Sequence, residues 1–163
     1  DGGYDARWVH FRIGPVTIPM PNTAARRRAL PLHDLHHIAT GYDTSWVGEG
    51  EIGAWEIASG CGRHVAAWIL ALAAMQIGVL IAPRRAWRAF VRGRQSRTLF
   101  VETWDERMLD GSIGALRARM GLGRAVRPAR TIDAILFVAW SLPLILGMVT
   151  LLSGMVALGR VIF

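Results

Sequence analysis

A mostly α-helical protein with a short N-terminal β-hairpin and a C-terminal transmembrane helix is predicted by three features of the sequence. β-Branched and aromatic residues flank a Gly-Pro pair near the N-terminal end, apolar residues recur at helical spacing after it, and Ala134–Gly159 carries no charge. A helix that crosses a bilayer needs ~20 apolar residues. Hydrophobic residues make up 52% of the 163 residues, which excludes a disordered chain. We therefore divide the chain into an extension (1–24), a helical domain (25–130) and a membrane helix (131–163).

The N-terminal part predicts a hairpin followed by two short helices. Trp8–Ile13 and Val16–Met20 are rich in strand-forming residues and surround a turn pair. Asn22-Thr23 caps a short helix over residues 24–28. Pro31 suits the first turn of the next helix, which ends near residue 40 because Gly41 favours the left-handed conformation of a helix C-terminus.

The middle of the chain predicts further helices. Trp46–Ser59 forms the second arm of a helical hairpin, and the uncharged Val65–Ala82 follows it. This stretch lies at the lower edge of spanning length, and a buried helix has the same pattern. Arginines at positions 84, 88 and 92 alternate with apolar residues, a pattern typical either of a membrane-surface helix or of a basic helix packed on its own domain. Leu116–Leu122 predicts another short amphipathic helix.

The charge is unevenly distributed. The net charge of +7 comes from arginine alone, because the chain has no lysine. Residues 84–130 hold twelve arginines against four acidic residues, whereas residues 1–64 are close to neutral. A basic segment between apolar stretches indicates the cytoplasmic face of a membrane. We therefore expect the cell inner membrane, with the main domain on its cytoplasmic face. No nucleic-acid-binding motif accompanies the charge, so we expect no nucleic acid partner.

A group of metal-capable side chains lies in the helical hairpin. His33 and His37 are four residues apart, so both imidazoles project from one helix face. Asp34 follows the first histidine, and eleven residues separate His37 from Glu49 at the start of the next helix. Two nitrogens and two carboxylate oxygens suit a divalent ion. We expect a metal-binding helical hairpin that holds zinc, with iron, cobalt or manganese as alternatives.

The neighbouring polar residues are assigned other roles. His36 falls on a different helix face, so we expect it beside the site rather than in it. Glu56, seven residues after Glu49, shares its face and either supports the ligands or replaces that glutamate. Glu51 is expected to be solvated, and the isolated His10 and His64 to be structural.

The spaced motif His-Asp-x-x-His followed after eleven residues by Glu resembles that of the coenzyme Q biosynthesis protein 4 family. The resemblance runs from about residue 25 to residue 122. The residues that carry it are His33–Tyr42, Gly48-Glu49, Ala54-Trp55-Glu56, Phe90–Arg94, Trp104-Asp105-Glu106 and Leu116–Gly121. The hairpin and the C-terminal apolar segment lie outside it, so this would be an atypical, membrane-tethered member.

The resemblance implies a helical domain whose metal ligands are His33, Asp34, His37 and Glu49. It implies a role in ubiquinone biosynthesis, in oxidative decarboxylation or hydroxylation at C1 of a polyprenylated ring, an oxidoreductase or lyase activity. The implied partners are a polyprenyl-quinone intermediate or another isoprenoid lipid, the membrane, and other quinone-biosynthesis proteins. It also favours Val65–Ala82 as a buried or lipid-channel helix rather than a membrane span.

Two alternatives to this enzyme remain open at the level of sequence. The protein is otherwise a non-catalytic lipid-binding scaffold with a structural metal, or an enzyme of another lipid substrate; metal-dependent hydrolysis is a weaker option. No catalytic residue is assigned. Small residues at positions 147, 153 and 154 are compatible with a homo-oligomer.

Overall fold

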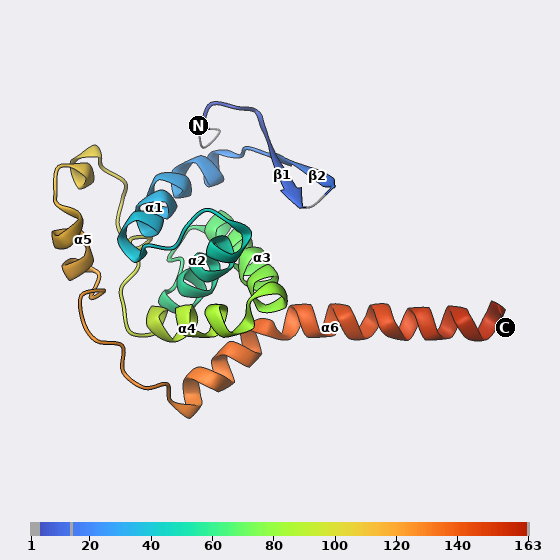
Figure 1. Cartoon of the computed structure of the whole chain (residues 1–163). Helices are drawn as coiled ribbons and strands as arrows, with labels where there is room; N and C mark the ends of the chain where they lie inside the picture. Colours follow the sequence, from blue (N-terminus) through green and yellow to red (C-terminus); the bar gives the residue numbers. More distant parts are fainter. Residues whose placement is uncertain (1–3, 14, 163) are drawn as a thin grey trace.

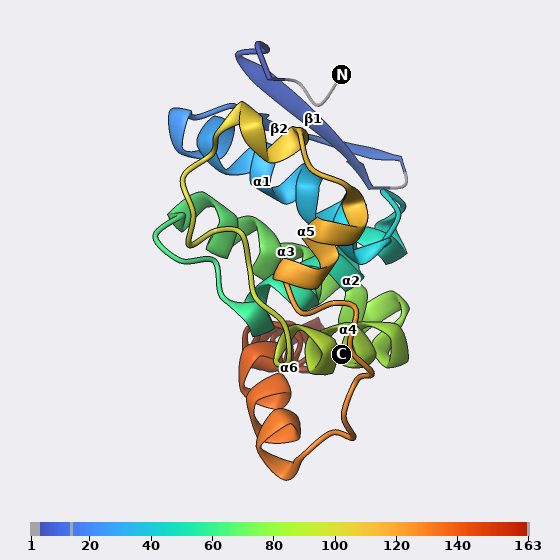
Figure 2. The same ribbon diagram turned by 90° about the vertical axis from the view of Figure 1, so that its left-hand side faces the viewer.

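The computed structural model describes residues 4–13 and 15–162, without the side chains of residues 11, 13, 16, 148, 149 and 151–162. Helices α1 to α4 form the body, the β-hairpin lies at its N-terminal side, and α6 extends away from it (Figure 1). Figure 2 shows α5 in front of α1, which it contacts. The elements are β1 (Trp8–Ile13), β2 (Val16–Pro21), α1 (Ala24–Thr40), α2 (Trp46–Ser59), α3 (Val65–Ile81), α4 (Pro83–Gly93), a 3₁₀ helix (Glu106–Leu109), α5 (Ile113–Arg119) and α6 (Thr131–Ile162).

The predicted hairpin is present, and polar contacts fix it to the helical body. Its two strands pair antiparallel from Trp8 opposite Pro21 to Ile13 opposite Val16. The indole N–H of Trp46, at the start of α2, donates a hydrogen bond to the carbonyl of Arg12 (3.1 Å). These contacts bring the N-terminal segment close to the α1–α2 pair.

Helix α1 is continuous, where the sequence predicted two helices separated at Pro31. The hydroxyl of Thr23 caps its first turn by accepting from the backbone N–H of Arg26, and Gly41 ends it at φ 79°. Proline in a helix interior removes one backbone hydrogen bond. Ala29 and Leu32, on either side of Pro31, are both buried. Packing of this shared face therefore holds the helix together across the proline.

Helix α2 lies at the centre of the body. Its buried residues run from Gly50 to Ile57 without a break, because α3 and α4 pack on two of its sides. Gly50 faces Gly78 of α3 so closely that a Cβ added at Gly50 would lie 2.4 Å from the Cα of Gly78. Real Cβ atoms do not approach so near, so this contact requires glycine on both helices.

The prediction of a C-terminal transmembrane helix is wrong. In the described part of the chain, no helix combines the length and the apolar character that crossing a bilayer requires. The predicted location in the inner membrane, with the main domain on its cytoplasmic face, rested on that helix and is overturned with it. Of the predicted span Ala134–Gly159, the side chains of 148, 149 and 151–159 lie outside the described residues.

The first turns of α6 belong instead to the surface of the helical body. Phe137 lies edge-on to Trp87 and Phe90, with ring centroids 5.2 and 5.3 Å apart, and Trp140 stacks on Trp68 at 5.5 Å. The amide of Gln76 donates to the carbonyl of Trp140 (2.9 Å). Apolar side chains that the sequence suggested for lipid contact thus pack against α3 and α4.

The other helices agree with the sequence in position but differ in detail. The small residues of α3 (Ala67, Ala71, Gly78) are buried, whereas Val65 and Ile69 are exposed. Of the two predictions for α4, the structure agrees with a basic helix packed on its own domain. Its buried residues are Ala86, Ala89, Phe90, Val91 and Gly93. Helix α5 begins at Ile113, three residues before the predicted helix, because the hydroxyl of Ser112 caps it.

The close approach of α2 and α3 predicts the sign of a stability change. Gly→Ala in a helix interior ordinarily stabilises by roughly 0.5–1 kcal/mol. For Gly50→Ala we expect a loss of about 1–3 kcal/mol instead, because the methyl group forces the two backbones apart. Chemical denaturation measures the change. Gly114→Ala in α5 is the matched control, because its Cβ would meet only the Ser112 hydroxyl at 3.8 Å. Equal effects of the two substitutions would contradict the packing described here.

Candidate metal centre

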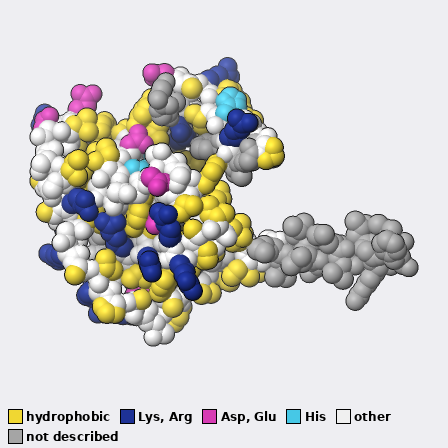
Figure 3. All heavy atoms as spheres, viewed as in Figure 1, with side chains coloured by type: hydrophobic (Ala, Val, Ile, Leu, Met, Phe, Trp, Pro, Cys, Tyr) yellow, Lys and Arg dark blue, Asp and Glu magenta, His cyan; other side chains and the backbone are white. Residues whose placement is uncertain are grey.

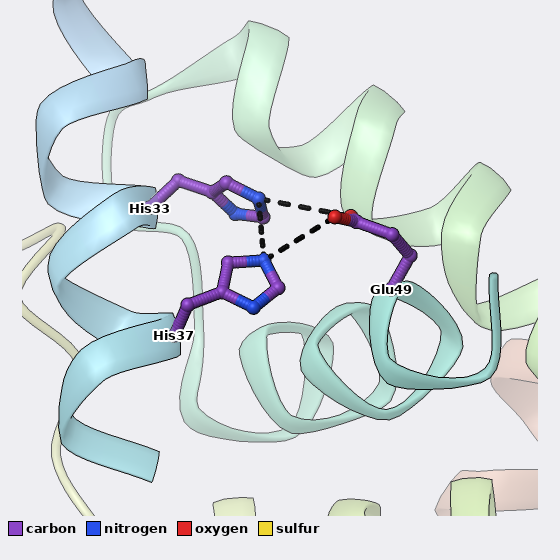
Figure 4. A group of neighbouring side chains, drawn as sticks. All are labelled: His33, His37 and Glu49. Carbon is purple, nitrogen blue, oxygen red and sulfur yellow. Dashed lines mark hydrogen bonds and ion pairs between the residues drawn. The ribbon is translucent and has the colours of Figure 1, made fainter. Parts of the chain in front are cut away.

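Three of the four predicted ligands meet between α1 and α2. His33 and His37 project from one face of α1, and Glu49 reaches them from the first turn of α2 (Figure 4). The Nε2 atoms of the two histidines are 3.2 Å apart. The Glu49 carboxylate lies 3.5 Å from Nε2 of His37 and 3.8 Å from Nε2 of His33. These three side chains could hold a metal ion.

The hydrogen bonds of the histidines decide which nitrogen faces the centre. Nδ1 of His37 lies 3.0 Å from the carbonyl oxygen of Tyr42, which only accepts, so Nδ1 carries a proton. Nδ1 of His33 lies 2.9 Å from Oε1 of Glu56, and by the same argument it donates. In the neutral rings, both Nε2 lone pairs therefore point toward the space beside Glu49. Such a support of the outer ring nitrogen is typical of metal-binding histidines.

The spacing of the donor atoms matches a small tetrahedral ion. Two nitrogens bound to zinc at about 2.0–2.1 Å lie about 3.3–3.4 Å apart in a tetrahedral arrangement. The observed separation of 3.2 Å between the two Nε2 atoms is close to this value. The distances to Glu49 exceed it by a few tenths of an ångström, which a small rotation of the carboxylate corrects. The three-residue group leaves one coordination position for a further ligand.

Access from solvent is compatible with a reactive site. The side chain of His37 is 10% exposed, whereas those of His33 and Glu49 are 26% and 31% exposed. A closed structural site would bury its ligands. The centre is thus held by α1 on one side and reachable on the side of Glu49.

Asp34, the fourth predicted ligand, does not join the group. It lies one residue after His33, about 100° around the helix, and its carboxylate accepts a hydrogen bond from the hydroxyl of Tyr4. Burial, followed by this hydrogen bond and the charge of Asp34, raises the pKa of Tyr4 above its ordinary value. No pattern in the sequence indicates this contact, because thirty positions separate the partners.

Glu56 supports the site from within the core. Its side chain is almost fully buried, and Oε1 lies 2.9 Å from Nδ1 of His33 and 2.8 Å from Nδ1 of His36. Nε2 of His36 accepts from the backbone N–H of Leu99 (2.9 Å), which leaves the proton of this ring on Nδ1. Of the two roles predicted for Glu56, the structure favours the supporting one. His36 lies beside the site, as its helix face indicated.

The ionisation of these groups follows from burial and charge. Burial disfavours the charged form of His33, but the charge and hydrogen bond of Glu56, and then the charge of Glu49, outweigh it and raise the pKa to about 9. Burial lowers the pKa of His36. For Glu56, burial opposes ionisation, yet the two histidines hold its pKa below the ordinary value. Burial raises the pKa of Glu49.

The remaining candidates lie apart from the centre. Glu51, expected to be solvated, is 8% exposed and forms an ion pair with Arg85. Burial lowers the pKa of His64, whose ring lies 5.3 Å from that of Phe100. His10 is exposed on β1. None of these three belongs to a group of metal-capable side chains in the described residues.

The raised pKa of His33 predicts how metal binding depends on pH. Below about 9 the free imidazole is mostly protonated, so an ion must displace a proton from Nε2. We expect the affinity for Zn²⁺ to rise by up to about tenfold per pH unit toward pH 9 and then to level off. Competition with a chromophoric chelator measures it. Glu56→Gln should move the plateau to lower pH, because it removes the charge that raises this pKa. An affinity that is constant between pH 6.5 and 9 would contradict the assignment.

Comparison with protein-family models, curated proteins and solved structures gives no match to this chain. The resemblance to the coenzyme Q biosynthesis protein 4 family therefore stays a prediction that rests on the spaced motif. The candidate metal centre is supported by the geometry of His33, His37 and Glu49.

Proposed function

We propose that the chain binds a divalent transition-metal ion through His33, His37 and Glu49, and that the remaining coordination position takes a substrate oxygen. The observation that carries this proposal is the convergence of two Nε2 atoms, 3.2 Å apart, whose Nδ1 atoms are both held by acceptors. Two imidazoles and one carboxylate are the donor set of many catalytic zinc sites, and iron, cobalt or manganese fit it as well. The ion would supply Lewis-acid polarisation of that oxygen.

Residues of the chain itself orient the two histidine rings and leave one side of the candidate site open. Glu56 and the carbonyl of Tyr42 keep the two histidine rings in one tautomer and one orientation. The partly exposed Glu49 leaves the outer side of the centre open to a ligand.

The substrate class we propose comes from the resemblance. A ring hydroxyl or carboxylate of a prenylated aromatic compound would lie against the centre. Zinc has no accessible second oxidation state, so an oxidative reaction at that ring needs a redox-active ion such as iron, or a partner protein. The second candidate is a non-catalytic scaffold with a structural ion. What favours it is the buried support of the ligands by Glu56 and His36, which serves stability as well as catalysis.

Removal of one ligand tests the site. We expect His37→Ala to abolish stoichiometric zinc or iron binding, because one nitrogen and its convergence with His33 are lost. Glu49→Gln, which keeps the shape of the side chain, should weaken binding by at least about tenfold. Elemental analysis after dialysis against each ion measures the content. His10→Ala on the exposed β1 strand is the matched control and should retain the ion. Full metal content in the His37→Ala protein would remove the proposal.

Turnover separates the two candidate functions. We expect the iron-loaded protein to release CO₂ from a prenylated hydroxybenzoic acid in the presence of O₂ and a two-electron donor such as ascorbate, which reduces the second oxygen atom to water, and the His37→Ala protein to release none. Retention of the ligand without any turnover, at full metal content, would identify the scaffold. Release of CO₂ at the same rate from the His37→Ala protein would show that the reaction does not use this centre.

A further inference from the structure

A hollow rich in arginine lies between the end of α4 and the coil that follows α5. Its volume is about 280 Å³, and three arginines line it: Arg92, Arg124 and Arg127. None of the described residues that line it is acidic. Figure 3 shows arginine side chains gathered over the lower part of the body, where Figure 1 places α4 and the coil before α6. None of the metal ligands lines this hollow.

The wall formed by the coil is fixed to the segment that follows α4. The side-chain amide of Gln95 donates to the carbonyl of Arg127 (3.0 Å), and its oxygen accepts from the N–H of the same residue (2.7 Å). The backbone N–H of Arg97 donates to the carbonyl of Met120 (2.9 Å) at the other end of this coil. An irregular segment outside regular secondary structure is thus tied at two places. The hollow is therefore a defined feature rather than a gap beside a free loop.

The three arginines lack the carboxylate partners that other arginines have. In the described part of the chain, Arg85, Arg94 and Arg119 form ion pairs with acidic residues, whereas Arg92, Arg124 and Arg127 form none. Arg92 donates one N–H to the carbonyl of Thr40 (2.9 Å) and lies 5.4 Å from the centre of the Tyr42 ring. Like charges around one hollow repel each other, so an anion placed among them is stabilised.

An apolar hollow adjoins the first. Its volume is about 420 Å³, and it shares Arg92 and Val126 with the arginine-lined hollow. Trp87 and Val91 form much of its remaining wall. Glu51 also lines it, but that carboxylate is paired with Arg85. A ligand that fills both hollows needs an anionic head and an apolar or aromatic body.

We propose that these two hollows bind a phosphomonoester. Its phosphate would lie among Arg92, Arg124 and Arg127, and its organic part against Trp87 and Val91. Phosphate suits this place because guanidinium groups present paired donors that match its oxygens, and because it carries up to two negative charges. The phosphate belongs either to a soluble ester or to the headgroup of phosphatidic acid. The proposal does not depend on the function of the metal centre.

Calorimetric titration with inorganic phosphate and with phenyl phosphate at constant ionic strength tests the site on the full chain. We expect saturable one-site binding of both, tighter for phenyl phosphate because of its aromatic body. Arg124→Gln/Arg127→Gln should weaken it by at least about tenfold, since charge-assisted hydrogen bonds are lost. Arg84→Gln/Arg117→Gln is the control with the same charge change outside both hollows, and it should bind as the unmodified chain does. Absence of binding by every probe, including the vesicles below, or an equal loss in the control, would overturn the proposal.

Vesicles distinguish the two sources of phosphate. Co-sedimentation with phosphatidylcholine vesicles that contain phosphatidic acid, lost in Arg124→Gln/Arg127→Gln but not in the control, would identify the lipid headgroup. Binding of phenyl phosphate without co-sedimentation would identify a soluble ester. Equal co-sedimentation with phosphatidylserine vesicles, whose phosphate is a diester, would show general charge attraction and overturn the proposed site.

Discussion

The carboxylate of Glu56 is the group that joins the metal centre to the core. Two imidazoles surround it, one from a candidate ligand and one from His36, and both donate to the same oxygen. A buried carboxylate without such partners would destabilise the fold by several kcal/mol. Both hydrogen bonds stabilise the buried carboxylate, and the one from His33 also fixes the orientation of that ring. Stability and the geometry of the centre therefore depend on one residue.

Helix α2 presents both Glu49 and Glu56 toward α1, while its other sides pack closely against α3 and α4. Gly50 and Gly78 bring the backbones of α2 and α3 into contact, and His36 extends the connection to the backbone of Leu99. The rings of Trp55 and Phe100 lie 4.9 and 4.7 Å from that of His36. The histidine side of α1 thus rests on a densely packed layer. Dense packing of this kind restricts the rotamers of the ligands.

What the sequence revealed about the fold and the site depended on the range of each interaction. His33 and His37 lie one helical turn apart and Glu49 follows after a short connection, so helical geometry and the predicted helical hairpin together indicated that they meet. The partner of Asp34 lies thirty positions away and no pattern in the sequence indicates it, whereas the helix face that Glu56 shares with Glu49 predicted its supporting role as one of two alternatives. Pro31 was predicted to begin a helix because proline is favoured in the first turn. In the structure the helix continues across Pro31, because the residues on either side of it are packed in the core.

The apolar C-terminal segment led to the largest error. Hydropathy counts apolar residues without telling what they contact, and Phe137 and Trp140 contact aromatic rings of α3 and α4. Buried Asp133, paired with Arg94 at 3.3 Å, fixes the start of α6 to the end of α4. The positive charge of residues 84–130 was interpreted as a sign of a membrane surface because apolar stretches flank this segment in the sequence. The structure instead gathers part of it around a defined hollow.

The contact between Tyr4 and Asp34 joins the segment before β1 to the helix that carries the two candidate histidine ligands. Asn22 donates to the backbone carbonyls of Tyr4 and Ala6, so this segment is anchored where β2 leads into α1. A shortened protein that begins after β2 would keep His33, His37 and Glu49 but would release the carboxylate beside them. Alterations at Tyr4 or Asn22, far in sequence from the candidate ligands, therefore reach helix α1 directly beside His33.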